Sequence, residues 1–286
     1  MPKDLNSKFK INNSKFSECL VLKKSFKNVF PFKIGCPSYI FPDHIIPNVR
    51  AIGPYVDEIE LILFESKPES LPTGREIKIL KTLSKDLDIT FNIHLPLNVY
   101  LGSHDDTLRK KSIEILRGIF DLTEPLNPTT HTLHLVYDGT ADDEENRKRW
   151  KSNLFESFEE LLSKGIDGES ISVETLSYPL NWIDDIIEAF DLSVCLDVGH
   201  LLLTNTPLSD TINRYCDRIS IYHLHGVKEG RDHHSINNLP KAVWHLLLDM
   251  LKRFKGVVSI EVFSFDRLNK SLYAFENHWN HFIQWR

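Results

Sequence analysis

Histidine and acidic side chains that could bind a metal are concentrated in one short stretch of the sequence. Residues 217–236 read DRISIYHLHGVKEGRDHHSI, an apolar run that ends in HLH and is followed by a polar loop. The candidate ligands of this stretch are His223, His225, Asp232, His233 and His234. Neutral imidazoles together with carboxylates are the ligand chemistry of zinc, iron and manganese. The stretch therefore predicts a metal site at the end of a buried strand.

Five further apolar runs each end in a carboxylate or an imidazole. The residues at these ends are His94, His134, Glu174, Asp197, His200 and Glu261. Aspartate and glutamate are rarely buried unless they are paired or bind a metal, and no lysine lies at these ends to offset their repulsion. The positive charge must come from protonated histidines, from Arg231 or from a metal. We favour a metal.

Short apolar runs alternate with longer amphipathic segments from residue 31 onward, which is typical of a parallel sheet built from βα units. The expected strands span 32–40, 58–66, 89–97, 132–138, 171–177, 192–200, 218–226 and 257–264. Helical spacing of apolar residues predicts helices over 74–87, 104–120, 143–164, 181–190, 239–253 and 267–283, and a weaker one near 48–55. Eight such units in about 255 residues predict an α/β fold, a (β/α)8 TIM barrel, whose active site lies at the C-terminal ends of the strands.

Composition and charge are those of a soluble globular protein, with 41% hydrophobic and 26% charged residues among 286. We expect a polar N-terminal extension over residues 1–30 and a single barrel domain over 31–286. No apolar run approaches the roughly 20 residues of a membrane span, and the four cysteines form no C-x-x-C pair. These features predict a cytoplasmic protein with reduced thiols and no membrane contact. The net charge of −6 disfavours a nucleic-acid partner.

With these positions, residues 31–285 resemble the xylose-isomerase-like barrel superfamily, which contains endonuclease IV and many sugar isomerases and epimerases. In the epimerase branch, strands five to eight supply four ligands to one metal, and the matching residues here are Glu174, Asp197, His223 or His225, and Glu261. Endonuclease IV has further ligands, which correspond to His94, His134, His200, Asp232 and His234. If the alignment instead follows the serine after the histidine pair, His233 becomes the ligand and Arg231 falls at the position of the aspartate.

Three stretches resemble a narrower group of this superfamily, the cobamide-remodelling phosphodiesterases. They read IGCPSYIFPDHIIPNVRAIGPYVDEIELILFES, NIHLPL and HLHGVKEGRDHHS. The resemblance implies that the substrate is an adenosylated cobamide, whose nucleotide loop is hydrolysed at its phosphoester. It also implies one to three divalent metal ions, with zinc expected before manganese or iron. Such ions would activate a water molecule and neutralise phosphate charge, and Glu174 and Glu261 would be the catalytic carboxylates.

Four residues are expected to bind the substrate. Arg231 could hold a phosphate through two hydrogen bonds, and it lies six residues after His225, a spacing that substrate-binding pairs of the epimerase branch share. Glu65 and Tyr39 lie near the mouth of the barrel by strand phase. Tyr39 could also contribute to an apolar wall for a corrin ring or for its lower-ligand base.

Three other functions are compatible with the same residues. A sugar isomerase or epimerase would use one metal, with Glu174 and Glu261 as paired bases, and would not need His94, His134 or His200. An abasic-site DNA endonuclease would need a basic rim for its substrate, which the net charge does not support. A barrel that only binds a corrinoid would have no reason to keep costly buried charges.

Overall fold

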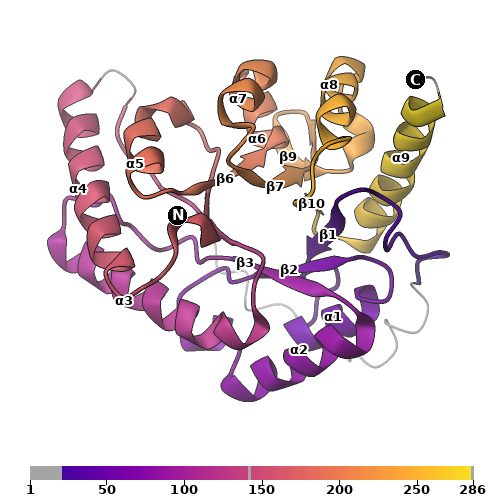
Figure 1. The fold of residues 1–286 in the computed structure, drawn as a ribbon, viewed down its shortest axis with the longest axis horizontal. Helices are drawn as coiled ribbons and strands as arrows, with labels where there is room; N and C mark the ends of the chain where they lie inside the picture. Colours follow the sequence, from indigo (N-terminus) through magenta and orange to yellow (C-terminus); the bar gives the residue numbers. More distant parts are fainter. Residues whose placement is uncertain (1–20, 141–142, 285–286) are drawn as a thin grey trace.

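A closed barrel of eight parallel strands forms the centre of the protein (Figure 1). The structure is a computed structural model that describes residues 21–140 and 143–284. The barrel strands are β1 (Lys33–Pro37), β2 (Glu58–Ile62), β3 (Thr90–His94), β4 (His131–Leu133), β5 (Ile171–Glu174), β6 (Ser193–Asp197), β7 (Ile219–Leu224) and β10 (Val257–Ile260). Each pairs with its neighbour in chain order, and β10 closes the barrel against β1. The predicted (β/α)8 fold is confirmed.

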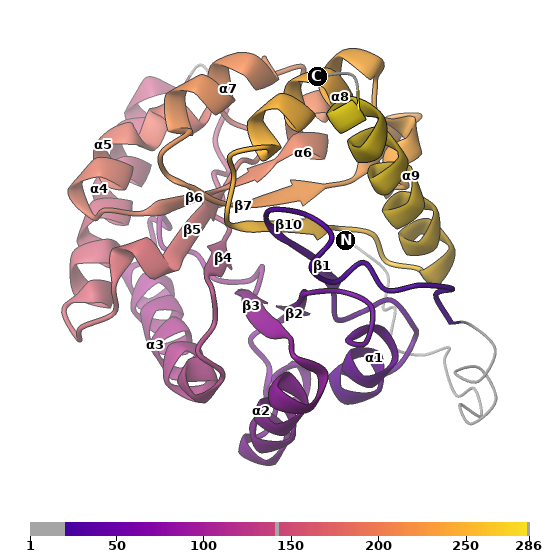
Figure 2. The same cartoon turned by 45° about the vertical axis from the view of Figure 1, so that its right-hand side comes forward.

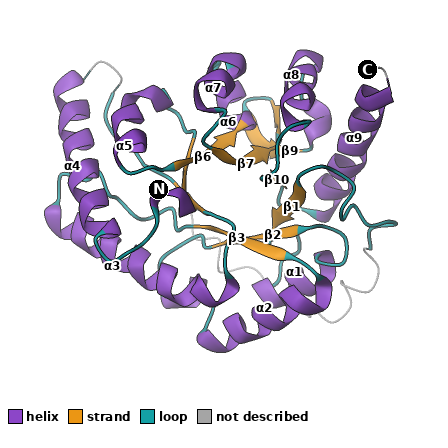
Figure 3. Cartoon of the chain, viewed as in Figure 1, coloured by secondary structure: helices purple, strands orange, loops and turns teal. Residues whose placement is uncertain are grey.

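Helices surround the strands on the outside, as the turned view shows (Figure 2), and Figure 3 shows the same separation in two colours. They are α1 (Ile45–Ile52), α2 (Gly74–Leu87), α3 (Asp106–Thr123), α4 (Glu144–Leu162), α5 (Asp184–Ala189), α6 (Val198–Leu203), α7 (Leu208–Tyr215), α8 (Lys241–Leu251) and α9 (Phe265–Gln284). Local sequence explains where they begin. Thr73 and Glu76, for example, form a reciprocal capping box at the start of α2. Within residues 21–140 and 143–284, no helix combines the length and the apolar character that a membrane span needs.

One element after β7 differs from the expected loop. Strands β8 (Gly226–Lys228) and β9 (Arg231–His234) pair antiparallel as a short hairpin. Glu229 and Gly230 both have positive φ angles, 54° and 71°, as a two-residue hairpin turn requires. The hairpin returns the chain toward the barrel mouth, and it thereby positions the histidines that follow the turn.

The described part of the expected N-terminal extension packs on the barrel. Phe26 is fully buried and contacts Tyr273 edge to face, while Phe30 packs on Phe275 and Trp279 of α9. The burial of these large apolar rings stabilises the contact between this segment and α9. Residues 21–30 therefore form one unit with the barrel, and residues 1–20 lie outside the described part of the chain.

The interior of the barrel is unusually polar. TIM barrels mostly fill this space with branched apolar side chains. Here fully buried side chains include Glu58 and Glu60 of β2, Asn92 of β3, Ser172 of β5 and Ser259 of β10. Buried carboxylates are costly unless they have partners, so each of these groups must be accounted for by its contacts.

Candidate metal centre

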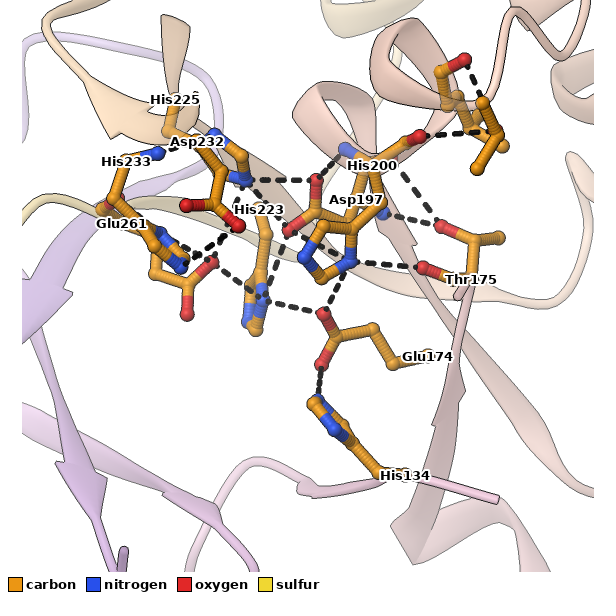
Figure 4. Close-up of polar contacts among 12 residues, drawn as sticks. His134, Glu174, Thr175, Asp197, His200, His223, His225, Asp232, His233 and Glu261 are labelled. Atoms are coloured by element: carbon orange, nitrogen blue, oxygen red, sulfur yellow. Dashed lines mark hydrogen bonds and ion pairs between the residues drawn. The ribbon is translucent and has the colours of Figure 1, made fainter. Parts of the chain in front are cut away.

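Six strand ends bring imidazoles and carboxylates together at the C-terminal mouth of the barrel (Figure 4). The residues that meet there are His94, His134, Glu174, Asp197, His200, His223, His225, Asp232, His233 and Glu261. They lie at or directly after the ends of β3 to β7 and β10, in helix α6 after β6, or on hairpin β8–β9. The structure thus brings these side chains together at the C-terminal face of the barrel, where the active sites of TIM barrels lie.

Glu174 lies between two groups of histidines. Its Oε2 atom is 2.7 Å from His134 Nε2 and 3.4 Å from His94 Nε2. Its Oε1 atom is 3.2 Å from His200 Nδ1 and 3.8 Å from His223 Nδ1. Burial alone would raise the pKa of the Glu174 carboxyl, but the neighbouring charge of His134, with hydrogen bonding from the histidines, holds it well below its usual range. An ionised carboxylate with its two oxygens facing different imidazole pairs has the geometry of a bridging ligand.

Three carboxylates surround Nδ1 of His223. The distances from this atom are 3.4 Å to Glu261 Oε2, 3.8 Å to Glu174 Oε1 and 4.0 Å to Asp197 Oδ2. Over the described ranges, His223 Nδ1, Glu174 Oε1 and Glu261 Oε2 are buried without a hydrogen-bond partner. Unpaired buried polar atoms that converge on one point cost stability, and a cation bound between them would remove that cost. The donor set therefore fits a divalent metal ion.

Asp197 connects this centre to helix α6. Its Oδ1 atom accepts the backbone N–H of His200 at 2.7 Å and so caps the helix. Burial would raise the pKa of the Asp197 carboxyl, but His225 and His200 beside it lower it below its usual range. Asp197 in turn raises the pKa of His200 to about 10, against the lowering effect of burial. These contacts favour an ionised carboxylate beside protonated imidazoles, and a bound cation would take the place of those protons.

His225 lies beside Asp197 and Glu261 in the site. Its side chain is fully buried, and its Nε2 atom is 3.0 Å from Asp197 Oδ1. Its Nδ1 atom accepts the backbone N–H of His233 at 3.0 Å, so the ring proton lies on Nε2 and faces Asp197. His225 also belongs to two groups that could hold a metal ion, one with Asp197 and His200 and one with His233 and Glu261. The structure therefore places both alternatives, His223 and His225, among the candidate ligands, and a substrate-binding role of His225 stays a prediction.

A cluster on the hairpin contains His233, whereas the sequence predicts His234 as the ligand beside Asp232. His200, Asp232 and His233 each bring a ligand atom within 4.8 Å of the others. Side chains normally alternate along a strand, but His233 has a φ of 51°, and this left-handed backbone breaks the alternation. Asp232 and His233 therefore both face the mouth, and His234 is left outside the cluster. His233 is the histidine that the alternative alignment on the following serine selects, and Asp232 is the aspartate of the first alignment.

Three expected substrate-binding residues lie on the rim. Arg231 is exposed at the start of β9, opposite Lys228. Glu65 is also exposed and forms an ion pair with Lys67 at 2.8 Å. Tyr39 is 42% exposed. None of the three belongs to the buried clusters described above, so any role in substrate binding would be exerted at the rim.

Exposed aromatic and apolar side chains flank the metal ligands on two sides. Tyr39 packs edge to face on Phe64 at 5.4 Å between ring centroids, and Phe64 lies near Phe263, which contacts His233. On the other side, a hollow of about 360 Å³ adjoins the histidines. It is lined by His134, Val136, Tyr137, Leu176, Ser177, Tyr178, His200, Leu203 and Thr204. Both surfaces could contact a ligand with extended apolar faces.

One buried carboxylate beside the site was not among the expected residues. Glu60 of β2 is fully buried, and its Oε1 atom is 2.9 Å from His223 Nε2. Alternation along EIELI, where Glu58 and Glu60 share one face, contained the signal. The expected site considered only strand ends, so this residue from the middle of the barrel was missed.

Comparison with known proteins identifies the family. The family model described as xylose isomerase-like TIM barrel matches residues 47–281. A comparison with curated proteins gave no match. Among solved structures, one described as a D-tagatose 3-epimerase-like protein has a TM-score of 0.73 at 17% identity, covering 88% of this chain and 100% of its own.

Two further structures show the same fold. A 3-keto-D-glucoside 4-epimerase from E. coli has a TM-score of 0.66 at 14% identity, covering 86% of this chain and 98% of its own. SacUVDE has a TM-score of 0.62 at 12% identity, with 86% and 98% covered. At such identities the likeness shows the fold alone, whereas the family model spans most of the sequence. The chain belongs to the xylose isomerase-like TIM barrel family.

Proposed function

We propose that the protein is a metal-dependent hydrolase that cleaves the phosphoester in the nucleotide loop of a cobamide. The observation that carries this proposal is the position of Glu174. One of its oxygens faces His94 and His134, and the other faces His200 and His223. A carboxylate shared in this way is suited to a site with more than one metal ion, which is the arrangement that phosphoester hydrolysis uses.

The chain offers ligands for up to three ions. His94, His134 and Glu174 would hold one, and His200, Asp232 and His233 another. The third set is Glu174, Asp197, His223 and Glu261. When bound, divalent ions would supply a nucleophilic hydroxide at neutral pH and neutralise charge on phosphoryl oxygens. Nitrogen and carboxylate donors fit zinc first, with manganese or iron as alternatives.

Two carboxylates are positioned to handle protons. Glu174 and Glu261 each have one buried oxygen without a hydrogen-bond partner in the described chain, and both oxygens lie within 4 Å of His223. A carboxylate in that position can accept the proton that water loses as it adds to phosphorus. The bond from phosphorus to the leaving oxygen breaks, and that oxygen takes up a proton.

The surroundings of the site support a large substrate with apolar faces. The aromatic wall of Tyr39, Phe64 and Phe263 lies on one side, and the apolar hollow beside His134 lies on the other. A corrin ring and a lower-ligand base both have flat, largely apolar surfaces. Arg231 on the rim could reach a phosphate, since guanidinium groups bind phosphate through paired hydrogen bonds.

A sugar isomerase or epimerase is the second candidate. The solved structures named above include sugar epimerases by title, and the pair Glu174 and Glu261 flanks one point near His223. Paired carboxylates on two sides of a sugar could move a proton from one face to the other. This function has no use for His94, His134 or His200.

Hydrolysis of a cobamide in water enriched in oxygen-18 tests the proposal. The metal-loaded protein should release a nucleoside or nucleotide fragment, and mass spectrometry should find one heavy oxygen in the products. Glu174→Gln should abolish the reaction. The matched control is Glu276→Gln. Glu276 lies on the outer helix α9 and forms an ion pair with Lys24. An intact cobamide, together with epimerisation of a ketohexose by the same preparation, would support the second candidate instead.

A further inference from the structure

Glu60 contacts the metal centre from inside the barrel, below the candidate ligands. It lies on β2, and its side chain crosses the interior toward β7 and β10. Its Oε1 atom is 2.9 Å from His223 Nε2, and its Oε2 atom accepts a hydrogen bond from Ser259 Oγ at 2.6 Å. Glu60 is fully buried and lies outside the candidate ligand sets named above. The candidate ligand that it contacts directly is His223.

His223 has carboxylates on both of its nitrogens. Nδ1 faces Glu174, Asp197 and Glu261 at 3.4–4.0 Å, and Nε2 lies 2.9 Å from Glu60 Oε1. The buried Cys195 thiol also lies beside this ring. A neutral imidazole carries one proton, and the nitrogen without it is the one that binds a metal. Three carboxylates around Nδ1 favour a proton on Nδ1, which would block metal binding there. A carboxylate at Nε2 favours a proton on Nε2 and leaves Nδ1 free.

We propose that Glu60 is a positioning residue that keeps the ring proton of His223 on Nε2 and leaves Nδ1 free to bind a metal. Histidine ligands commonly donate their second ring N–H to a carboxylate, which fixes the tautomer and the ring orientation. The inference rests on the metal centre of the proposed function. It does not depend on the substrate or on the reaction.

Ser259 fixes which oxygen of Glu60 is available. Its hydroxyl donates to Oε2, so Oε1 remains for His223. In the described chain, Glu60 Oε1 and His223 Nε2 are both buried without a hydrogen-bond partner, and the two atoms lie 2.9 Å apart. The carboxylate is thus held on one side by β10, and its free side faces β7. Loss of the Ser259 hydroxyl should loosen this arrangement without removing the carboxylate.

Glu58 provides a matched control on the same strand. It is also fully buried and points into the same interior. Its oxygens accept hydrogen bonds from Asn92 at 2.8 Å and Thr129 at 2.7 Å, and Lys33 lies 3.6 Å away. Within the described ranges, the hydrogen-bond and ion-pair partners of Glu58 are Thr90, Asn92, Thr129 and Lys33, and none of them is a candidate metal ligand. Glu58→Gln and Glu60→Gln therefore make the same chemical change at equal burial, with only one of them touching His223.

The test is the zinc affinity of the full-length protein, measured by competition with a chromophoric chelator. Glu60→Gln should weaken zinc binding about 10- to 100-fold, the usual effect of losing such a partner. Ser259→Ala should weaken it less, and Glu58→Gln should leave it unchanged. Unchanged affinity in Glu60→Gln, or an equal loss in Glu58→Gln, would overturn the inference.

Nitrogen-15 NMR of the histidine rings supplies a second readout that a purely structural role would not move. In the zinc-loaded wild-type protein, the His223 signals should report a proton on Nε2 and a metal on Nδ1, and Ser259→Ala should shift the Nε2 signal. The Ser259→Ala variant supplies this readout if Glu60→Gln does not fold. A proton on Nδ1 in the zinc-loaded wild-type protein would contradict the inference. Zinc binding that depends on Glu60 without cobamide hydrolysis would overturn only the proposed function.

Discussion

The Nε2 atom of His134 lies 2.7 Å from Oε2 of Glu174, on the side of that carboxylate that faces away from His223. A single-metal centre built on Glu174, Asp197, His223 and Glu261 would leave this contact without a catalytic purpose. A second ion beside Glu174 would use it. A single-metal centre and a multinuclear centre therefore predict different effects of substituting His134.

His134→Ala should lower the metal content by one equivalent per chain and slow cobamide hydrolysis by at least roughly tenfold, since it removes a ligand directly. His104→Ala is the control, because His104 is exposed and contacts Asn146 outside the site. Metal analysis and a product assay on both variants check the prediction. Full activity and unchanged metal content in His134→Ala would remove the basis for a second ion.

Two adjacent histidines on the hairpin should behave differently. His233→Ala should reduce metal content and hydrolysis, because His233 lies in the cluster with His200 and Asp232. His234→Ala should leave both within about twofold of the wild-type values, since His234 lies outside that cluster. The same metal analysis and assay apply. The reverse order of effects would mean that the hairpin positions the other histidine.

Much of this site can be predicted from the sequence, because the C-terminal ends of all the strands lie at one face of a barrel. His94, Glu174 and Asp197 are the last residues of their strands, and regular alternation points them inward. The position of His233 could not be predicted in the same way. Its positive φ depends on how the hairpin packs, and alternation alone favours His234 as the partner of Asp232.

Other features needed contacts that no local pattern reports. Leu22, Phe26 and Phe30 recur every four residues, yet they lie among so many polar residues that the segment reads as a tail. Their burial depends on the aromatic surface of α9. His225 and His223 are equivalent by alternation on β7, and only the contacts with Asp197 and the hairpin separate their roles.

Gly199 should not tolerate alanine. A Cβ atom at this position would lie 1.9 Å from Cε1 of His225, a ring already held by Asp197 and the backbone of His233. Gly199→Ala should lower the free energy of unfolding by roughly 1–3 kcal/mol, as overpacking does. Urea denaturation measures this change.

Gly118 provides the opposite control for this substitution. It lies within α3, and a Cβ there would have no neighbour within 4 Å. Gly118→Ala should raise the free energy of unfolding by about 0.5–1 kcal/mol, because alanine favours helix interiors over glycine. Similar effects of the two substitutions would contradict the packing of His225 against Gly199.

Acid stability should reveal His131, which is buried against Phe120 on the outside of β4. Burial lowers the pKa of His131 to about 4. Between pH 4 and the unfolded-state pKa near 6.5, His131 binds a proton in the unfolded chain but not in the folded protein. The stability that the neutral ring allows is therefore fully present above pH ~6.5 and is lost as the pH falls toward 4. The loss should approach about 3 kcal/mol near pH 4.

The measurement is urea unfolding of chelator-treated protein between pH 4 and 7, compared with His131→Gln. Chelator treatment excludes acid-induced release of metal as a cause of the change in stability. Titratable groups that wild type and His131→Gln share cancel in the difference between their unfolding free energies. The difference in unfolding free energy between wild type and variant should shrink as the pH falls. A difference that is constant over this range would mean that His131 is not held neutral by the fold.

The most direct test of the metal centre is the number of divalent ions per chain in the purified protein, measured by inductively coupled plasma mass spectrometry after zinc reconstitution and removal of loosely bound metal. We expect two or three equivalents, because the Glu174 carboxylate faces candidate ligands on both of its sides. One equivalent or fewer would contradict a multinuclear centre and would favour a single-metal isomerase or a binding protein.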